Sequence, residues 1–353
     1  MKHFGKLAAA TLCGSLFAAC SGGTGSVAPS VPSAPGQSVN AAPASGKMSQ
    51  EFRLTKPMRL RCTVIGRKSL GAEPNTPQIC DTTTNRIKHV FFTRAFLKRH
   101  PKIKVGRNAG YYSSSSSNNL VYGGGPVETT PAIYLIFWGI NGPNDTTNDP
   151  NGMATYITNF YGAVGGSSWM NTDTQYYQNG PQYIGNPSGE LAGVWYDTSS
   201  SPPSNYTDAQ VAAEADAGSA HFGYNANANY VVVTPTGTAE SGFGSQWCAY
   251  HSIDGNGVSY TDMPYVSDAG SGCGAGSVNS PGTLDGVSIV GGHEEAETQT
   301  DPGAGNGWID SSGSEIGDKC AWMNLQNTNF PNGSTFPTQP LWSNASSGCV
   351  QAY

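Results

Sequence analysis

The chain has 353 residues, of which 37% are hydrophobic and 12% are charged, and its formal net charge is −6. The charge is divided along the sequence, because residues 47–107 contain fifteen Lys or Arg and three Asp or Glu, whereas residues 108–353 contain Lys319 alone against twenty-one Asp or Glu. This division predicts a domain boundary at Arg107, and the acidity of the longer part predicts no nucleic-acid partner.

The first 46 residues predict export rather than a folded domain. Residues 1–19 are typical of a signal peptide, with two lysines before a thirteen-residue apolar core that is too short to span a bilayer. Cys20 follows two alanines, as in the lipobox of bacterial lipoproteins, although Phe17 stands where leucine is usual, and we predict Cys20 as the lipidation site. Residues 20–46, rich in Ser, Gly, Ala and Pro, predict a lipid-anchored flexible tether.

These features predict a lipoprotein of the outer membrane or cell surface, attached to the membrane only through its lipid. Ordinary secretory cleavage with release outside the cell is the alternative.

Residues 47–107 form a basic segment that has folding patterns of its own. Apolar positions between 54 and 65 are typical of strands, and the run from Ile87 to Leu97 is helix-like. We predict a pro-region that docks on the acidic domain by complementary charge. A permanent N-terminal subdomain and a binder of anionic surfaces are the alternatives.

The acidic domain, residues 108–353, predicts an α/β fold. Continuous apolar runs predict buried strands, and apolar spacings of three and four predict helices. The predicted elements are a strand at 132–138, a helix at 155–164, a strand at 191–196, a helix at 208–222 and a strand at 230–234. Alternation of this kind predicts a mixed sheet with central parallel strands.

After residue 234 the sequence no longer shows alternating strands and helices. Gly-rich irregular chain extends to about Gly282, with a short edge strand at 263–266, and a helix then begins at a cap provided by Thr283 or Asp285. A mixed sheet followed by a metal-bearing helix is the order of zincin folds, so we expect a zincin-like, disulfide-stabilised domain.

The number of cysteines in the chain indicates disulfide bonds and therefore an exported protein. Cys13 lies in the signal peptide and Cys20 is the lipidation candidate, so six cysteines are left for three disulfides. Fifteen pairings are open to six cysteines, and we prefer the sequential one because it closes each half of the chain on itself. The predicted pairs are Cys62 with Cys80, Cys248 with Cys273, and Cys320 with Cys349.

The run from Gly291 to Glu297, GGHEEAE, resembles the HExxH motif of zinc hydrolases with Glu297 in place of the second histidine. His293 and Glu297 are four apart, so on a helix they share one face and can bind one zinc ion. The acid-rich surroundings favour a cation there over a buried histidine bonded to a carbonyl. Glu295 fits a solvent-exposed acidic face.

Further donors come from outside the helix. Glu315 and Asp318 lie in a turn anchored by a predicted disulfide, and we predict both as additional metal ligands. His251 is a catalytic candidate that faces either a ligand or the substrate, and Glu294 is the predicted general base. The alternatives are that Asp318 caps its turn and that His251 lies on a surface loop. Because Glu297 makes the site more anionic than HExxH, calcium or manganese could replace zinc.

Three segments resemble the EXORDIUM, or phosphate-induced, proteins of plants and their bacterial relatives. They are CAYH (248–251), DGVSIVGGHEEAE (285–297) and EIGDKC (315–320). The resemblance is strongest over residues 245–322, and Asp301 stands where the family pattern has Asn. It implies an extracellular, wall-associated protein, and it groups as one set His251, His293, Glu294, Glu297, Glu315 and Asp318. It implies no particular reaction.

The function that we expect is an exported metal-dependent hydrolase, specifically a zinc peptidase, acting as a monomer on a peptide or cell-wall substrate. The main alternative is a non-catalytic surface lipoprotein in which the same residues hold a structural metal or bind wall polysaccharide. An exported glycan hydrolase is a third hypothesis. The sequence contains no GxSxG or GxxxxGK pattern, so it lacks the signature of a nucleophile elbow or a P-loop.

Overall fold

The computed structural model describes residues 76–103, 105, 119–303 and 305–353, which all belong to one compact unit. The predicted signal peptide, the tether with Cys20, Cys62 and the strand-like positions at 54–65 lie outside the described residues.

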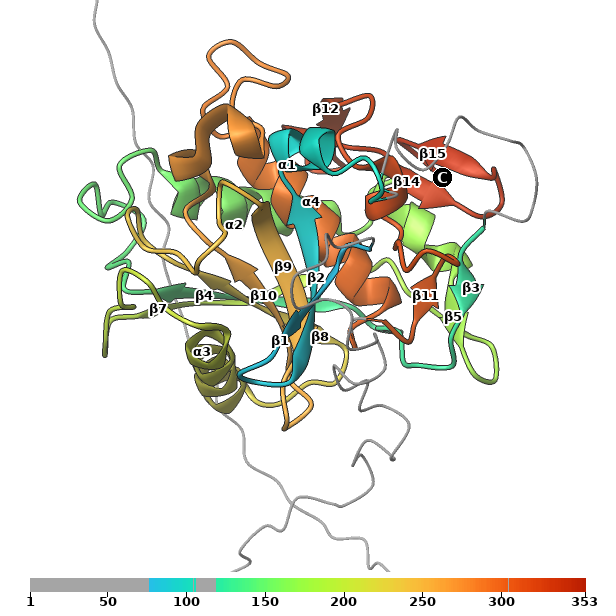
Figure 1. The fold of residues 1–353 in the computed structure, drawn as a ribbon, viewed down its shortest axis with the longest axis horizontal. Coiled ribbons are helices and arrows are strands. Elements are labelled where there is room, and N and C mark those ends of the chain that lie inside the picture. The colour runs from blue at the N-terminus through green and yellow to red at the C-terminus, as the bar shows by residue number, and fades with distance from the viewer. Residues whose placement is uncertain (1–75, 104, 106–118, 304) are drawn as a thin grey trace, which may run out of the picture. The chain divides into compact units, whose positions relative to one another are not determined.

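A seven-stranded mixed sheet organises the fold, in the order β1-β2-β9-β10-β8-β4-β7 (Figure 1). Four neighbouring strands are parallel, namely β10 (Ser259–Met263), β8 (Ala228–Val233), β4 (Ala132–Trp138) and β7 (Leu191–Asp197). The other three continue the sheet in antiparallel pairs, namely β9 (Trp247–Ile253), β2 (Arg86–Phe92) and β1 (Gln78–Asp81). The predicted α/β class and the mixed sheet with parallel strands are confirmed.

Helices cover both faces of this sheet (Figure 1). Alternate residues of a strand point to opposite faces. On β8, the Asn229 side chain donates to Glu295 of α4 (Asp285–Thr300), whereas the next residue, Tyr230, donates to Gly223 at the end of α3 (Asp208–Phe222). A further helix, α2 (Met153–Val164), packs beside α4. The five elements predicted between 132 and 234 therefore exist, with ends shifted by at most two residues.

Residues 247–263 contradict the prediction of irregular chain. They form β9 and β10, and the predicted edge strand at 263–266 is wrong, because β10 ends at Met263 and lies between β8 and β9. The sequence pattern did not predict β10, because this strand contains several polar residues. Thr261 donates to Asn229 of β8 (3.0 Å) and Asp262 accepts from Tyr206 (2.9 Å), so both are buried with partners from other parts of the chain.

The helix predicted from Ile87 to Leu97 is wrong over residues 87–92 and exists only from Arg94 onward. The chain forms β2, which is buried on both faces and therefore has a continuous apolar run, and then turns into the short α1 (Arg94–Arg99). The Thr93 hydroxyl caps α1 by accepting from the amide of Phe96 (3.1 Å).

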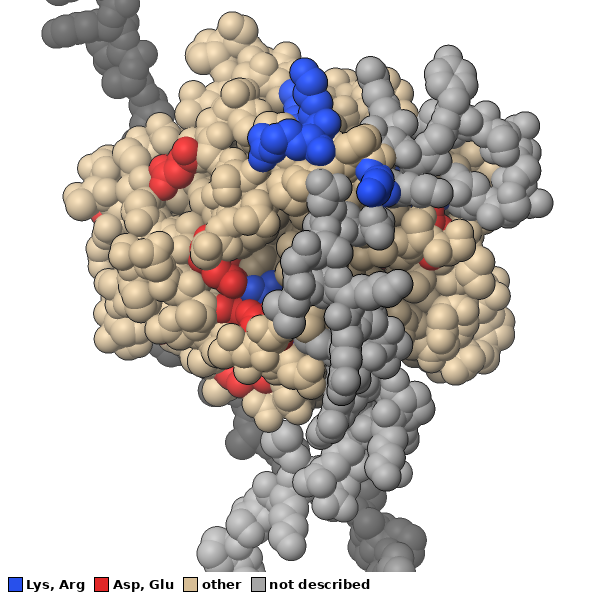
Figure 2. All heavy atoms as spheres, viewed as in Figure 1, with Lys and Arg blue, Asp and Glu red and all other residues tan. Residues whose placement is uncertain are grey.

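The described part of the basic segment belongs to the sheet. Lys88 of β2 pairs with Asp81 of β1 (3.2 Å) and with Glu240 (2.5 Å), and Arg86 pairs with Asp208 (3.4 Å). Figure 2 shows acidic side chains around a basic one near the centre of this face, while other Lys and Arg gather over α1. Two basic side chains of β2 thus pair with acidic residues of the longer part of the chain, Asp208 at the start of α3 and Glu240.

Short elements complete the fold around α4. The 3-10 helices of the described residues are η5 (Met170–Gln175), η6 (Val266–Cys273) and η7 (Asp318–Cys320). Paired short strands are β3 (Val121–Tyr122) with β11 (Trp308–Ile309), β5 (Tyr177–Gln178) with β6 (Gln182–Tyr183), β12 (Gln326–Asn329) with β13 (Thr335–Thr338), and β14 (Leu341–Ser343) with β15 (Gly348–Val350).

Two predicted disulfides are confirmed, Cys248–Cys273 and Cys320–Cys349. Cys80 is also disulfide-bonded, and its predicted partner Cys62 lies outside the described residues. Disulfides fit an exported protein.

Among the helices of the described residues, none combines the length and apolar character needed to cross a bilayer.

Candidate metal centre

Helix α4 carries the predicted motif and is buried over its whole length. Gly291 and Gly292 explain how it fits among large side chains. A Cβ atom at Gly292 would lie 2.9 Å from the Trp169 ring and 3.0 Å from the Phe160 ring, so only glycine leaves room for this packing. The solvent-exposed face predicted for Glu295 is wrong, because this residue is fully buried.

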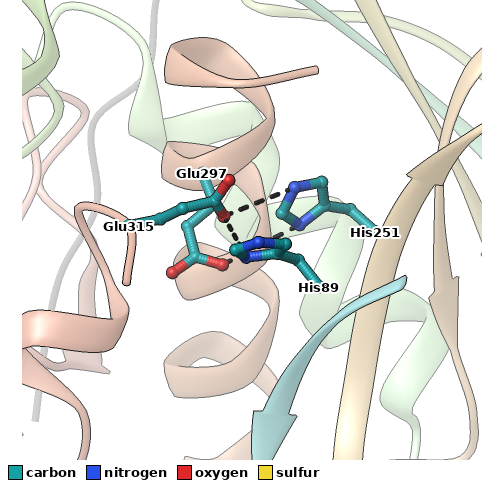
Figure 3. Close-up of side chains that lie close together, drawn as sticks. All are labelled: His89, His251, Glu297 and Glu315. Carbon is teal, nitrogen blue, oxygen red and sulfur yellow. Dashed lines mark ion pairs between the residues drawn. The ribbon is translucent and has the colours of Figure 1, made fainter. Parts of the chain in front are cut away.

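One group of donors joins two strands to the helix (Figure 3). It consists of His89 on β2, His251 on β9, Glu297 on α4 and Glu315 before η7, and one ligand atom from each lies within 4.8 Å of all the others. His89 and His251 are directly opposite each other in the β2–β9 ladder, which brings their rings to one face of the sheet. Nδ1 of His89 lies 2.8 Å from Glu315 Oε2, and Nε2 of His251 lies 3.5 Å from the same oxygen.

A second group shares Glu297 with the first. It consists of His293, Glu297 and Asp318, again with one ligand atom each within 4.8 Å of the others. Nε2 of His293 lies 3.1 Å from Glu297 Oε1 and 3.9 Å from Asp318 Oδ1. The backbone amide of Asp318 donates to Glu297 Oε1 (2.9 Å), which ties η7 to the helix.

Several donor atoms are buried without a hydrogen-bond partner. These are both ring nitrogens of His89 and of His293, and Nε2 of His251. Carboxylate oxygens lie near them, with Glu315 Oε2 2.8 Å from Nδ1 of His89 and Glu297 Oε1 3.1 Å from Nε2 of His293. Buried polar atoms in native proteins nearly always have partners. Ligands of a tetrahedral zinc ion lie roughly 3.3 Å apart, so separations of 2.8–3.9 Å suit atoms that face a shared cation.

The charges of the site lead to the same conclusion. Burial lowers the pKa of His89 to about 3 and the pKa of His251 to about 4, so both rings are neutral, which is the form that binds metal. Burial and the charge of Glu297 raise the pKa of Glu315 and that of Asp318 well above the usual values. A buried group of carboxylates is costly to ionise unless a cation lies among them.

Lys319 does not remove this cost. It is the only Lys or Arg after Arg107, and its ammonium pairs with Asp310 at 3.2 Å. The donor set of imidazoles and carboxylates therefore fits a divalent metal, while the identity of the metal stays a prediction.

Glu294 lies beside the first donor group. Its Oε2 lies 3.1 Å from Nδ1 of His251, and its Oε1 is buried with no hydrogen-bond partner. A carboxylate that holds one nitrogen of an imidazole, while the other nitrogen faces metal ligands, is a common way to orient a metal-binding histidine. Burial and the charge of Glu297 raise the pKa of Glu294.

The structure brings all six predicted site residues together and adds His89. His251 is not on a surface loop, because it is fully buried in β9. His89 was missed because it is a single histidine in a segment interpreted as a pro-region, with no motif spacing around it. Only the pairing of β2 with β9 brings it to His251.

The donors are closed off from the surface, with exposed fractions between 0% and 2%. A surface hollow of about 580 Å³ lies at the N-terminal end of α4, next to Tyr156 and Asp285, and none of the donors lines it.

No protein-family model, curated protein or solved structure matches the chain. The resemblance to EXORDIUM proteins stays a prediction.

Proposed function

We propose that this chain is an exported metal-dependent hydrolase, more specifically a zinc peptidase with Glu294 as general base. The observation that supports it best is the convergence of three histidines and four carboxylates on one side of α4. The type of donor also favours catalysis, since catalytic zinc sites use His and Glu ligands whereas structural zinc sites are rich in Cys. All cysteines of the described residues are disulfide-bonded.

Each residue has a role in this proposal. The metal would be held by residues from the two donor groups, which together contain His89, His251, His293, Glu297, Glu315 and Asp318, and it would polarise a peptide carbonyl and make water more acidic. Oε1 of Glu294 would take the proton of the attacking water and return it to the leaving amine, while Oε2 keeps the His251 ring oriented. The position of α4 against an antiparallel strand of a mixed sheet supports a zincin-like interpretation.

Localisation belongs to the same proposal. The disulfides support export, and lipid attachment at Cys20 would hold the protein at the outer membrane or cell surface. A peptide is the substrate that the resemblance of the motif to HExxH favours, with a cell-wall polymer as the alternative.

A structural metal is the second candidate function, and the complete burial of the donors favours it. Catalytic zinc sites keep one coordination position open to water or substrate, whereas structural sites are closed. Hydrolysis at this site would require movement of the covering chain.

Glu294→Gln separates the two candidates. We expect the zinc-loaded full chain to hydrolyse casein, and the variant to lose about 100-fold or more of the rate while it keeps its zinc, because Gln cannot accept the proton. Metal content and casein hydrolysis are measured on the same samples.

Glu295→Gln is the matched control. Glu295 is the neighbouring buried carboxylate, but it accepts from Asn229 (2.9 Å) and Gln299 (3.1 Å) rather than facing the donors, so this variant should keep the activity. Bound zinc with no hydrolysis by the wild type, or with equal rates in wild type and Glu294→Gln, would contradict the hydrolase and favour the structural metal. Absence of bound metal would contradict both.

A further inference from the structure

We propose that the centre holds two divalent metal ions bridged by the carboxylate of Glu297. The inference rests on the proposed metal-dependent function and deepens it. The first ion would be bound by His89, His251 and Glu315, and the second by His293 and Asp318, with one oxygen of Glu297 for each.

Glu297 turns its two oxygens to different histidines. Oε1 lies 3.1 Å from Nε2 of His293, and Oε2 lies 3.8 Å from Nδ1 of His251. Since Glu294 holds Nδ1 of His251, this distance places Oε2 on the His251 side of the site, next to the group that would bind the first ion. A carboxylate can bind one ion through each oxygen, so this orientation suits a bridge. The two donor groups share this residue and no other.

Asp318 spans the same two groups. Its Oδ1 lies 3.9 Å from Nε2 of His293, and its Oδ2 lies 3.9 Å from Nδ1 of His89. Two carboxylates from different elements, Glu297 on α4 and Asp318 in η7, thus lie between histidines of the sheet and the histidine of the helix.

The number of donors and their charge exceed the needs of one ion. A tetrahedral zinc ion uses four ligands, and the two groups supply six different residues. One divalent ion would balance only two of the buried carboxylates Glu294, Glu297, Glu315 and Asp318, and Asp301 beside Glu315 adds a fifth, so this acidity suits two ions better than one. Two-metal sites, with ions about 3.5–4 Å apart, are common in hydrolases, including aminopeptidases.

The experiment measures zinc per full chain by mass spectrometry after equilibration with zinc and removal of free ion. We expect two ions per chain in the wild type, and one each in His89→Ala and His293→Ala, since each variant damages a different group. His221→Ala is the control, because His221 stacks on Trp195 at the end of α3, and it should keep two ions. Circular dichroism checks that each variant is folded.

A second measurement does not depend on any variant. The wild type loaded with manganese should give an electron paramagnetic resonance spectrum of two exchange-coupled ions. One zinc per wild-type chain with an uncoupled manganese spectrum overturns the two-ion proposal and leaves the hydrolase proposal standing. No bound ion overturns both. If an alanine variant does not fold, the manganese spectrum decides alone.

Discussion

Gly317 shows how little space surrounds the centre. Its backbone is helical (φ −77°, ψ −43°), so a side chain would cause no backbone strain. A Cβ atom at this position, however, would lie 2.6 Å from Nδ1 of His293 and 3.0 Å from Oε1 of Glu297. Glycine is therefore needed here to leave room for two of the proposed ligands.

Gly317→Ala should weaken zinc binding by about 10-fold or more, because the methyl group displaces the His293 ring and Glu297 while the fold is retained. Zinc affinity measured by competition with a chelator checks this. Gly255→Ala is the matched control, since a Cβ atom at Gly255 meets no heavy atom within 4 Å. Equal affinities in the two variants would contradict the role assigned to Gly317.

For single residues, the sequence was most informative where the spacing between two residues fixes their relative position in space. His293 and Glu297 are one helical turn apart, so their shared face follows from helix geometry alone. Glu315 and Asp318 were predicted from their disulfide-anchored turn, and the disulfide at Cys320 is confirmed. His89 has no such relation to a neighbour in the sequence, so no local rule could select it.

Among the elements, the junction of α3 with β7 contains a buried acid pair. Glu214 on α3 is 7% exposed, and burial followed by the negative charge of Asp197, at the end of β7, raises the pKa of Glu214 to about 8. The folded protein therefore favours the protonated acid. This stabilisation is complete below the unfolded pKa of about 4.5 and is lost as the pH rises through about 8.

Glu214→Gln should therefore remove part of the pH dependence of stability. We expect the loss of melting temperature between pH 5 and pH 8 to be smaller in the variant than in the wild type, because Gln stays neutral throughout. Melting curves at matched ionic strength measure the difference. Parallel pH profiles in the two proteins would show that Glu214 does not titrate in this range.

Helices and strands with a strong local sequence pattern were predicted correctly, whereas a strand that depends on distant partners was not. The strand at 132–138 and the helix at 208–222 have strong local patterns, and both exist with these bounds. β10 is a polar-looking strand whose Thr261 and Asp262 find partners only after β8 and Tyr206 are in place. A pattern of hydrophobicity cannot reveal partners that come from elsewhere in the chain.

In the whole molecule, the basic segment, residues 47–107, is either a pro-region that is removed or a subdomain that is retained. Its strand β2 contributes His89 to the centre, and Phe91 of the same strand stacks on the rings of His293 (4.0 Å) and Trp322 (4.5 Å). Phe91 and Phe92 are buried, and burial of each such side chain stabilises by about 1.5–3 kcal/mol. These contacts favour a retained subdomain over a pro-region.

A chain that begins at Asn108 tests this. Compared with a chain that begins at Lys47, it should melt at a lower temperature and bind less zinc, because it lacks β1, β2 and His89. Calorimetry and metal analysis of both chains provide the comparison. If the shorter chain keeps the stability and the zinc of the longer one, the pro-region hypothesis gains support.

By itself, the sequence determined the features that depend on neighbours along the chain. These are the α/β class, the strongly patterned helices and strands, and the face shared by His293 and Glu297. The sequence favoured the pairing of Cys248 with Cys273 and of Cys320 with Cys349, and the structure decided it. The tertiary structure alone decided that β2 lies beside β9, and hence that His89 lies among the donors. The reason is physical, because strand partners and buried polar contacts depend on residues that are far apart in the sequence and meet only in the folded chain.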